Sequence, residues 1–136
     1  MNSPADDVRV MLEGESSLAL TLGENLYVSE MPDEIPGGPG VCVGLYDSGG
    51  FPPQPNFTYE YPTVQVQVRG LAGGYMEAYA MAQAILIALN GTFDVTIDSV
   101  RYVGVWAMQS PLFVGRDERN RPLFTINFRL HRGDAV

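Results

Sequence analysis

The stretch TVQVQVRGLAGGYMEAYAMAQAILIALNG, residues 63–91, predicts a β-strand followed directly by an α-helix. Every second residue from 64 to 68 is valine and the residues between them are polar, a pattern typical of a strand with one buried face. Over residues 75–89 apolar side chains recur at helical spacing, and Asn90-Gly91 is suited to end a helix. A strand with one polar face belongs to a sheet covered on one side, and the helix that follows is the expected cover.

The flanking sequence adds a second helix and further strands. Ser3-Pro4, followed by two acids, is a typical helix start, and Gly14 is a plausible end. Strands are expected at residues 26–29, 41–46, 93–97, 101–109 and 123–131. The 136 residues suit one domain. We therefore expect a single α+β domain over residues 1–136, with a mainly antiparallel sheet covered on one face by a central helix and a short N-terminal helix.

Two connections have the composition of loops. Residues 47–62 form a predicted Pro/Gly-rich loop, and its aromatic side chains need a surface to pack on, either on this chain or on a neighbour. Those side chains are Phe51, Phe57, Tyr59 and Tyr61. Residues 110–122 form a predicted polar hairpin connection whose tip, residues 115–121, is highly charged.

Charge is distributed unevenly along the chain. The net charge is −8, and residues 1–60 hold ten acids against one base, Arg9. Five of the eight arginines lie in the last 21 residues. Such a balance argues against a general nucleic-acid binder, which needs a basic face for phosphates. An acidic front half and an arginine-bearing tail suit head-to-tail contact between copies, although a mixed, solvated surface explains the charges equally well.

No residue pattern indicates catalysis or a cofactor. His131 and Cys42 are the only histidine and cysteine, which leaves a transition-metal site short of ligands and excludes an internal disulfide. The glycines of residues 70–74 match neither a dinucleotide fingerprint nor a P-loop, so they favour a tight turn. The longest apolar stretch is too short to cross a bilayer. Acids near the N-terminus favour an intracellular protein over a secreted one. We expect no enzymatic activity, no cofactor, no metal and no membrane contact.

The residues with the best case for contacting a partner are arginines and tyrosines. Arginine makes bidentate contacts with carboxylates across interfaces, whereas mixed charges at an exposed tip often serve solubility alone. Both readings stay open for the hairpin tip. The candidate contact residues are Arg69, Arg116, Asp117, Arg119 and Arg121, with Tyr59 and Tyr61 from the Pro/Gly-rich loop.

An ordered set of short motifs resembles the tail terminator family of long-tailed bacteriophages, also called minor capsid or tail-completion proteins. The motifs are Met31-Pro32-Asp33, Tyr61-Pro62 before residues 64–70, Leu89-Asn90-Gly91, Gln109-Ser110-Pro111, Gly115-Arg116-Asp117, Arg121-Pro122-Leu123-Phe124 and Asn127-Phe128. The resemblance begins at about residue 24 and covers most of the chain from there.

This resemblance implies a structural virion protein made in the host cytoplasm. It implies an α+β subunit in a six-membered ring at the head-proximal end of the tail, which ends polymerisation of the tail tube protein. It also implies that the ring joins the tail to head-completion, or neck, proteins, while DNA passes through the channel without specific binding. The alternative is an acidic monomeric adaptor or inhibitor protein that binds a basic partner.

Overall fold

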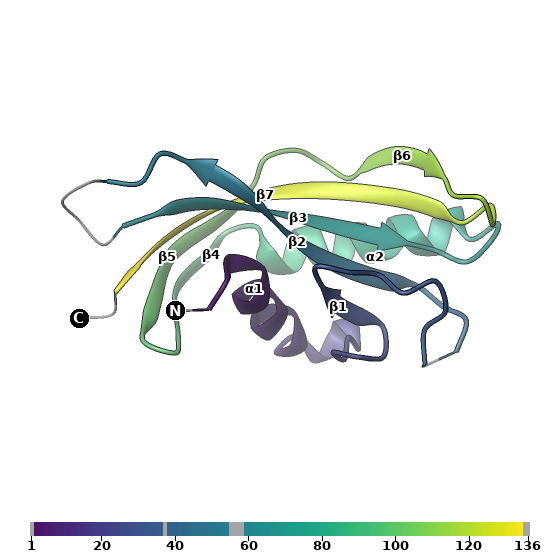
Figure 1. Ribbon diagram of the computed structural model, residues 1–136, viewed down its shortest axis with the longest axis horizontal. Helices are drawn as coiled ribbons and strands as arrows, with labels where there is room; N and C mark the ends of the chain where they lie inside the picture. Colours follow the sequence, from purple (N-terminus) through teal and green to yellow (C-terminus); the bar gives the residue numbers. More distant parts are fainter. Residues whose placement is uncertain (1, 37, 55–58, 135–136) are drawn as a thin grey trace.

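The computed structural model describes residues 2–36, 38–54 and 59–134, and these fold as a curled sheet with two α-helices (Figure 1). In chain order the elements are α1 (Pro4–Glu13), the 3-10 helix η1 (Ser16–Leu18), β1 (Leu26–Val28), β2 (Cys42–Phe51), β3 (Tyr61–Arg69), α2 (Tyr75–Leu89), β4 (Thr92–Ile97), β5 (Val100–Ala107), β6 (Leu112–Arg116) and β7 (Pro122–Asp134). The fold is thus mixed α and β, in agreement with the sequence pattern.

The sheet has seven strands in the order β1-β2-β3-β7-β5-β4, with β6 paired to β7. Only the β1–β2 pair is parallel, and every other described pair is antiparallel. The long strand β7 carries β3 along one side, while β5 and β6 share the other side. Strand β7 therefore connects all parts of the sheet.

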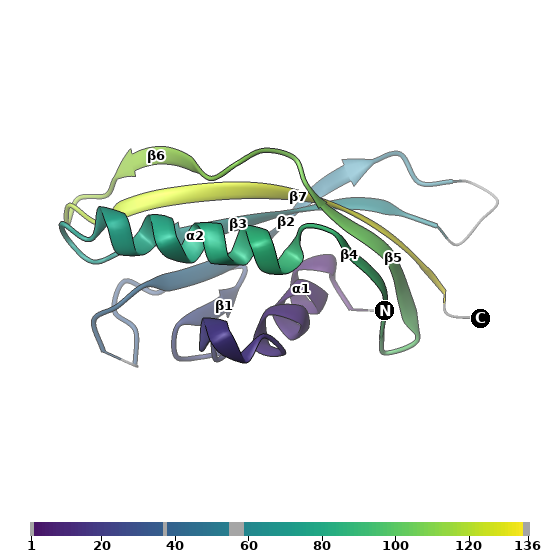
Figure 2. The ribbon, with the colours of Figure 1, turned by 180° about the vertical axis from the view of Figure 1, so that it is seen from behind.

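The β3–α2 unit forms as its sequence predicts. The three valines of β3 are fully buried, whereas Gln65 and Gln67 are partly exposed. Helix α2 contacts β3, β5 and β7, and Figure 2 shows α2 running below β7, with α1 further below. Gly70 allows this close approach, because a Cβ atom there would lie 2.9 Å from the Cβ of Ala78 and 2.9 Å from the carbonyl oxygen of Gly74.

Helix α1 begins and ends at the predicted residues. The Ser3 hydroxyl accepts a hydrogen bond from the backbone N–H of Asp6, Pro4 occupies the first turn, and Gly14 follows the last helical residue. The helix packs against β1, β2 and β3. Its buried side chains join those of α2 and the sheet in one hydrophobic cluster, in which Tyr102, Phe124 and Phe128 are the largest fully buried residues.

The loop predicted over residues 47–62 is shorter than expected. Strand β2 continues to Phe51 and β3 begins at Tyr61, so both ends of the predicted loop belong to a hairpin in which Phe51 pairs with Tyr61. The pairing shifts register between Asp47 and Gly50. The glycine-rich bulge there interrupts the alternation of residues that would have predicted the strand. Phe57 lies outside the described residues.

The connection predicted over residues 110–122 contains a strand. Residues Leu112–Arg116 form β6, which pairs with β7 as a hairpin, and the turn is limited to the residues that follow. The sequence did not reveal β6, because a register shift between Phe113 and Gly115 interrupts the alternation.

Candidate subunit-contact site

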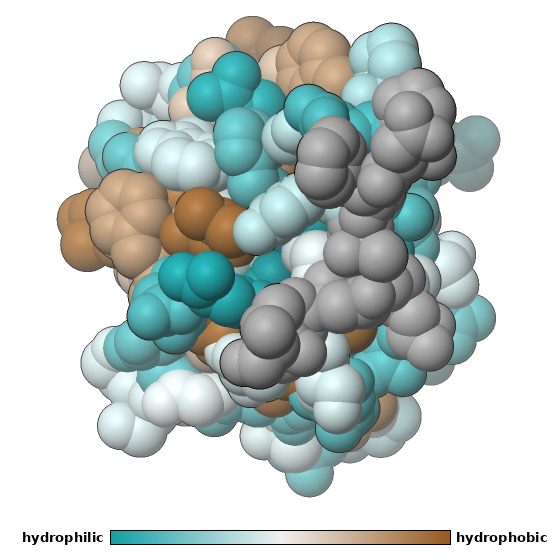
Figure 3. Space-filling model, turned by 90° about the vertical axis from the view of Figure 1, so that its left-hand side faces the viewer, coloured by the Kyte–Doolittle hydropathy of each residue, from teal (hydrophilic) through white to brown (hydrophobic). Residues whose placement is uncertain are grey.

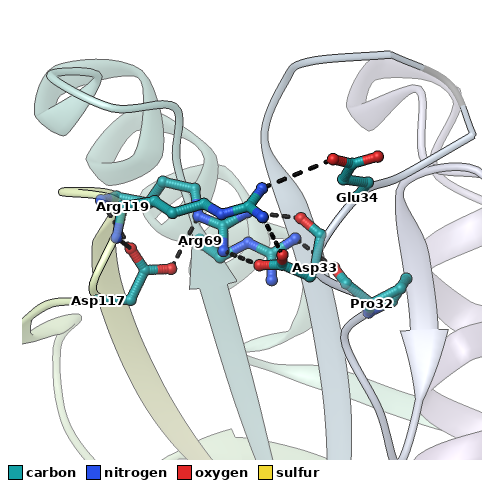
Figure 4. A network of polar contacts seen from close by, with 7 residues as sticks. Pro32, Asp33, Glu34, Arg69, Asp117 and Arg119 are labelled. Carbon is teal, nitrogen blue, oxygen red and sulfur yellow. Dashed lines mark hydrogen bonds and ion pairs between the residues drawn. The ribbon is translucent and has the colours of Figure 1, made fainter.

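The charged hairpin tip between β6 and β7 forms ion pairs and a hydrogen bond with the segment after β1. We call residues 31–35 the strap. The carboxylate of Asp33 bridges two guanidinium groups, with Oδ1 lying 2.6 Å from Nη2 of Arg121 and Oδ2 lying 2.6 Å from Nη2 of Arg119 (Figure 4). We call Arg119 and Arg121 the arginine clamp. An acid from the front half of the chain and arginines from its tail thus pair within one chain.

Two backbone carbonyls hold the strap independently of that carboxylate. Nη1 of Arg121 donates to the carbonyl oxygen of Asp33 at 2.6 Å, and Nη2 of Arg69 donates to the carbonyl oxygen of Pro32 at 2.6 Å. Arg69 is buried at the end of β3, beneath the strap. Arg69, Arg119 and Arg121, three of the candidate contact residues, therefore bind the strap of their own chain.

Asp117 orders the hairpin tip. One oxygen of its carboxylate accepts the backbone N–H groups of Arg119 and Arg121, each at 3.0 Å, and the other accepts Nε of Arg121 at 2.8 Å. Burial acts to raise the pKa of Asp117, but the hydrogen bonds from these arginines outweigh it, and the pKa lies below its ordinary value. Asp117 therefore fixes the orientation of the clamp.

The members of this network differ in exposure. The side chain of Arg121 is 15% exposed, whereas those of Arg119 and Asp33 are 55% and 58% exposed. Arg121 is therefore a structural anchor, and Arg119 and Asp33 are at the surface. Beside them lies a cavity of about 470 Å³, lined by the strap, the glycine turn after β3 and the clamp.

The other predicted contact residues occupy different positions. Arg116 is exposed on the same hairpin, with its guanidinium 5.4 Å from the ring centroid of Phe113. Tyr59 and Tyr61 lie at the opposite end of β3 from Arg69, roughly 26 Å away at the rise of a strand. The space-filling view of that end shows hydrophobic residues interspersed among hydrophilic ones (Figure 3). The predicted set therefore splits into two separate groups.

Tyr61 belongs to a row of rings that crosses the sheet. Its ring lies 4.7 Å from that of His131, which lies 4.7 Å from Trp106, and Trp106 lies 5.8 Å from Phe93. These residues come from the neighbouring strands β3, β7, β5 and β4. The guanidinium of Arg129 stacks over Trp106. Burial and the charge of Arg129 lower the pKa of His131. The histidine is therefore a packing residue between two aromatic rings.

A buried polar network, which sequence reasoning missed, joins the N-terminus to the sheet. The hydroxyl of Tyr102 donates to the carboxylate of Asp7, and it accepts a hydrogen bond from Nη1 of Arg132 at 3.2 Å. Arg132 also donates from Nε to Glu60 at 2.9 Å. Burial, followed by the hydrogen bond to Asp7, raises the pKa of Tyr102. In the sequence Asp7 is indistinguishable from an ordinary first-turn acid.

Other features of chemical interest have structural roles in the described part of the chain. Cys42 is buried in β2, and burial raises the pKa of its thiol. Among the described residues no three or more histidine, cysteine or acidic side chains come together as metal ligands. Within those same residues, no helix has the length and apolar character needed to span a membrane.

Comparison with known proteins identifies the family. The family described as bacteriophage tail terminator protein matches residues 14–132. A solved chain from the structure titled "Virion of native gene transfer agent (GTA) particle" has the same fold, with a TM-score of 0.74 and 20% identity over 97% of this chain and 99% of that chain. No curated protein matches the sequence. The family match spans nearly all of the described fold, from η1 to β7, and the chain accordingly belongs to the bacteriophage tail terminator family, as a structural tail protein of the virion.

Proposed function

We propose that this protein, acting as a single domain, forms a six-membered ring at the head-proximal end of the phage tail tube. The ring ends polymerisation of the tube protein and presents a surface to head-completion, or neck, proteins. The observation that carries the proposal is the match to the tail terminator family over residues 14–132. In this role the protein works by shape and charge and has no enzymatic activity.

In a closed ring every contact is heterologous, so one face of a subunit meets a different face of the next. We propose that the two helices close one face of the sheet, which leaves its ends and its other face for partners. The proposed contact residues form two groups at opposite ends of β3. They are Arg69, Arg116, Asp117, Arg119 and Arg121 at one end, and Tyr59 and Tyr61 at the other.

The charge of the subunit suits a channel through which DNA passes. With a net charge of −8, six copies repel the phosphate backbone and limit adhesion. The proposal therefore includes DNA passage without specific binding.

The decisive experiment is to measure tail lengths by electron microscopy in particles made without this gene. We expect tubes of uncontrolled length that do not join heads, and restoration of the normal length when the wild-type gene is supplied in trans. Tails of normal length without the gene would contradict the proposal. Native mass spectrometry of the assembled ring would test the stoichiometry separately, because it reports the number of copies directly.

A further inference from the structure

The end of the subunit that carries the arginine clamp also exposes apolar side chains. Met76 at the start of α2 is 68% exposed, and Leu71 in the glycine turn and Phe113 in β6 are also exposed. The ring centroid of Phe113 lies 5.3 Å from that of Tyr75, so β6 of the hairpin contacts the first residue of α2. Aromatic residues, methionine and arginine are the residue types enriched in protein interfaces.

Within the network around the arginine clamp, the Asp33 carboxylate is the member most easily exchanged. The side chain of Asp33 is exposed to solvent, whereas the guanidinium of Arg121 is also bound by the carboxylate of Asp117. The exposed pair between Asp33 and Arg119 contributes little to stability. The strap stays anchored through its backbone carbonyls when the carboxylate leaves. The clamp is thus preorganised for a carboxylate, and the Asp33 carboxylate that occupies it is accessible from solvent.

We propose that the arginine clamp binds an acidic side chain of a second copy of this chain, and that Asp33 occupies the clamp in the isolated subunit. The inference rests on the proposed ring and specifies one of its contacts. Charge complementarity identifies the occupant, because residues 1–60 hold ten acids against one base. Glu15, Glu24 and Glu30 in that half are exposed, and Arg9 is already paired with its own helix.

The chemistry of the site favours a carboxylate over a phosphate. Asp33 already shows how two carboxylate oxygens divide between two guanidinium groups. Glu34 lies 3.8 Å from Arg119, and Asp117 lies on the other side of the clamp. These acids repel any anion, and they repel a nucleic-acid backbone more than a single carboxylate, because the backbone carries a row of negative charges.

The test compares self-association of purified full-length variants by sedimentation across a range of protein concentrations. Asp33→Asn removes the internal competitor, Arg119→Gln weakens the clamp, and Glu118→Gln is the matched control, because it neutralises an exposed acid on the same tip. Asp33→Asn should lower the dissociation constant roughly two- to fivefold, since an occupied site reduces apparent affinity in proportion to its occupancy. Arg119→Gln should raise the constant in both the wild-type and the Asp33→Asn backgrounds, and Glu118→Gln should leave it unchanged.

Four outcomes would overturn the inference. Asp33→Asn could weaken association as Arg119→Gln does, which would make Asp33 part of the contact surface. The double variant could keep the full gain of Asp33→Asn, which would remove the clamp from the contact. All variants could stay monomeric at the highest attainable concentration. The Asp33→Asn variant could bind a fluorescent DNA duplex through the clamp, which would show that the clamp binds phosphate and not a carboxylate. Each of these leaves the proposed ring intact if tails lacking the gene still have uncontrolled length.

Discussion

Replacing Tyr102 with phenylalanine should destabilise the subunit through the buried network beneath α1. The substitution removes one hydroxyl that donates to Asp7 and accepts from Arg132, at a place where Tyr102 and Asp7 are both fully buried. Among the described residues, the carboxylate then keeps Asn2, at 3.4 Å, and the more distant Arg132, at 3.8 Å. Leaving a buried polar group underpaired costs about 1–3 kcal/mol. For a chain of this size, about 2 kcal/mol lowers the melting temperature by roughly 4–8 °C.

Thermal and urea unfolding of the wild type and the variant would measure this loss. Tyr79→Phe is the matched control, because the Tyr79 hydroxyl is only partly buried and bonds to Gln83 within the same helix. We expect that control to change the free energy of unfolding by less than about 0.5 kcal/mol. If Tyr102→Phe costs no more than the control, the buried hydroxyl does not stabilise the junction between α1 and the sheet, and the reasoning is refuted.

Three further predictions address separate parts of the fold. NMR titration of the single histidine should give His131 a pKa below its ordinary value of 6.5. Arg129→Gln should raise that pKa, because it removes a nearby positive charge; an unchanged pKa would show that the charge of Arg129 does not contribute. Because the folded-state pKa is the lower one, the contribution of His131 to stability is complete above about pH 6.5 and is lost as the pH falls through that value towards the folded-state pKa. Gly70→Ala should cost about 1–3 kcal/mol in urea unfolding, since its Cβ overlaps the next helix, whereas Gly40→Ala, which meets nothing within 4 Å, should be nearly neutral; equal costs would refute the close approach. Native Cys42 should react slowly with iodoacetamide at mildly alkaline pH and rapidly in urea, because burial raises its pKa; equal rates would show that the thiol is accessible.

Local periodicity predicted much of the fold from sequence. The valine alternation of β3 and the apolar stripe of α2 depend only on residues a few positions apart. The structure contains α2 with the expected bounds, and β3 covers the predicted strand and begins two residues earlier, at Tyr61. The start of α1 was equally readable, because Ser3 and Pro4 act on the adjacent turn. Strand β6 and the end of β2 were not predicted, because bulges interrupt their alternation and each becomes a strand only by pairing with a neighbour.

In the candidate site, too, the sequence predicted the local features and not the contacts between distant residues. The sequence by itself determined which arginines and acids are present, that their charges divide between the two halves, and, through an ordered set of motifs, the family resemblance that the family match confirms. Only the tertiary structure decided which charges meet. Asp33 and Arg121 are 88 residues apart, and Asp7 and Tyr102 are 95 apart. Such pairs come together because the strap, bound by Arg69 at the end of β3, reaches the turn before the neighbouring strand β7, and because α1 packs against the sheet. No local pattern encodes the partner of a side chain across that separation.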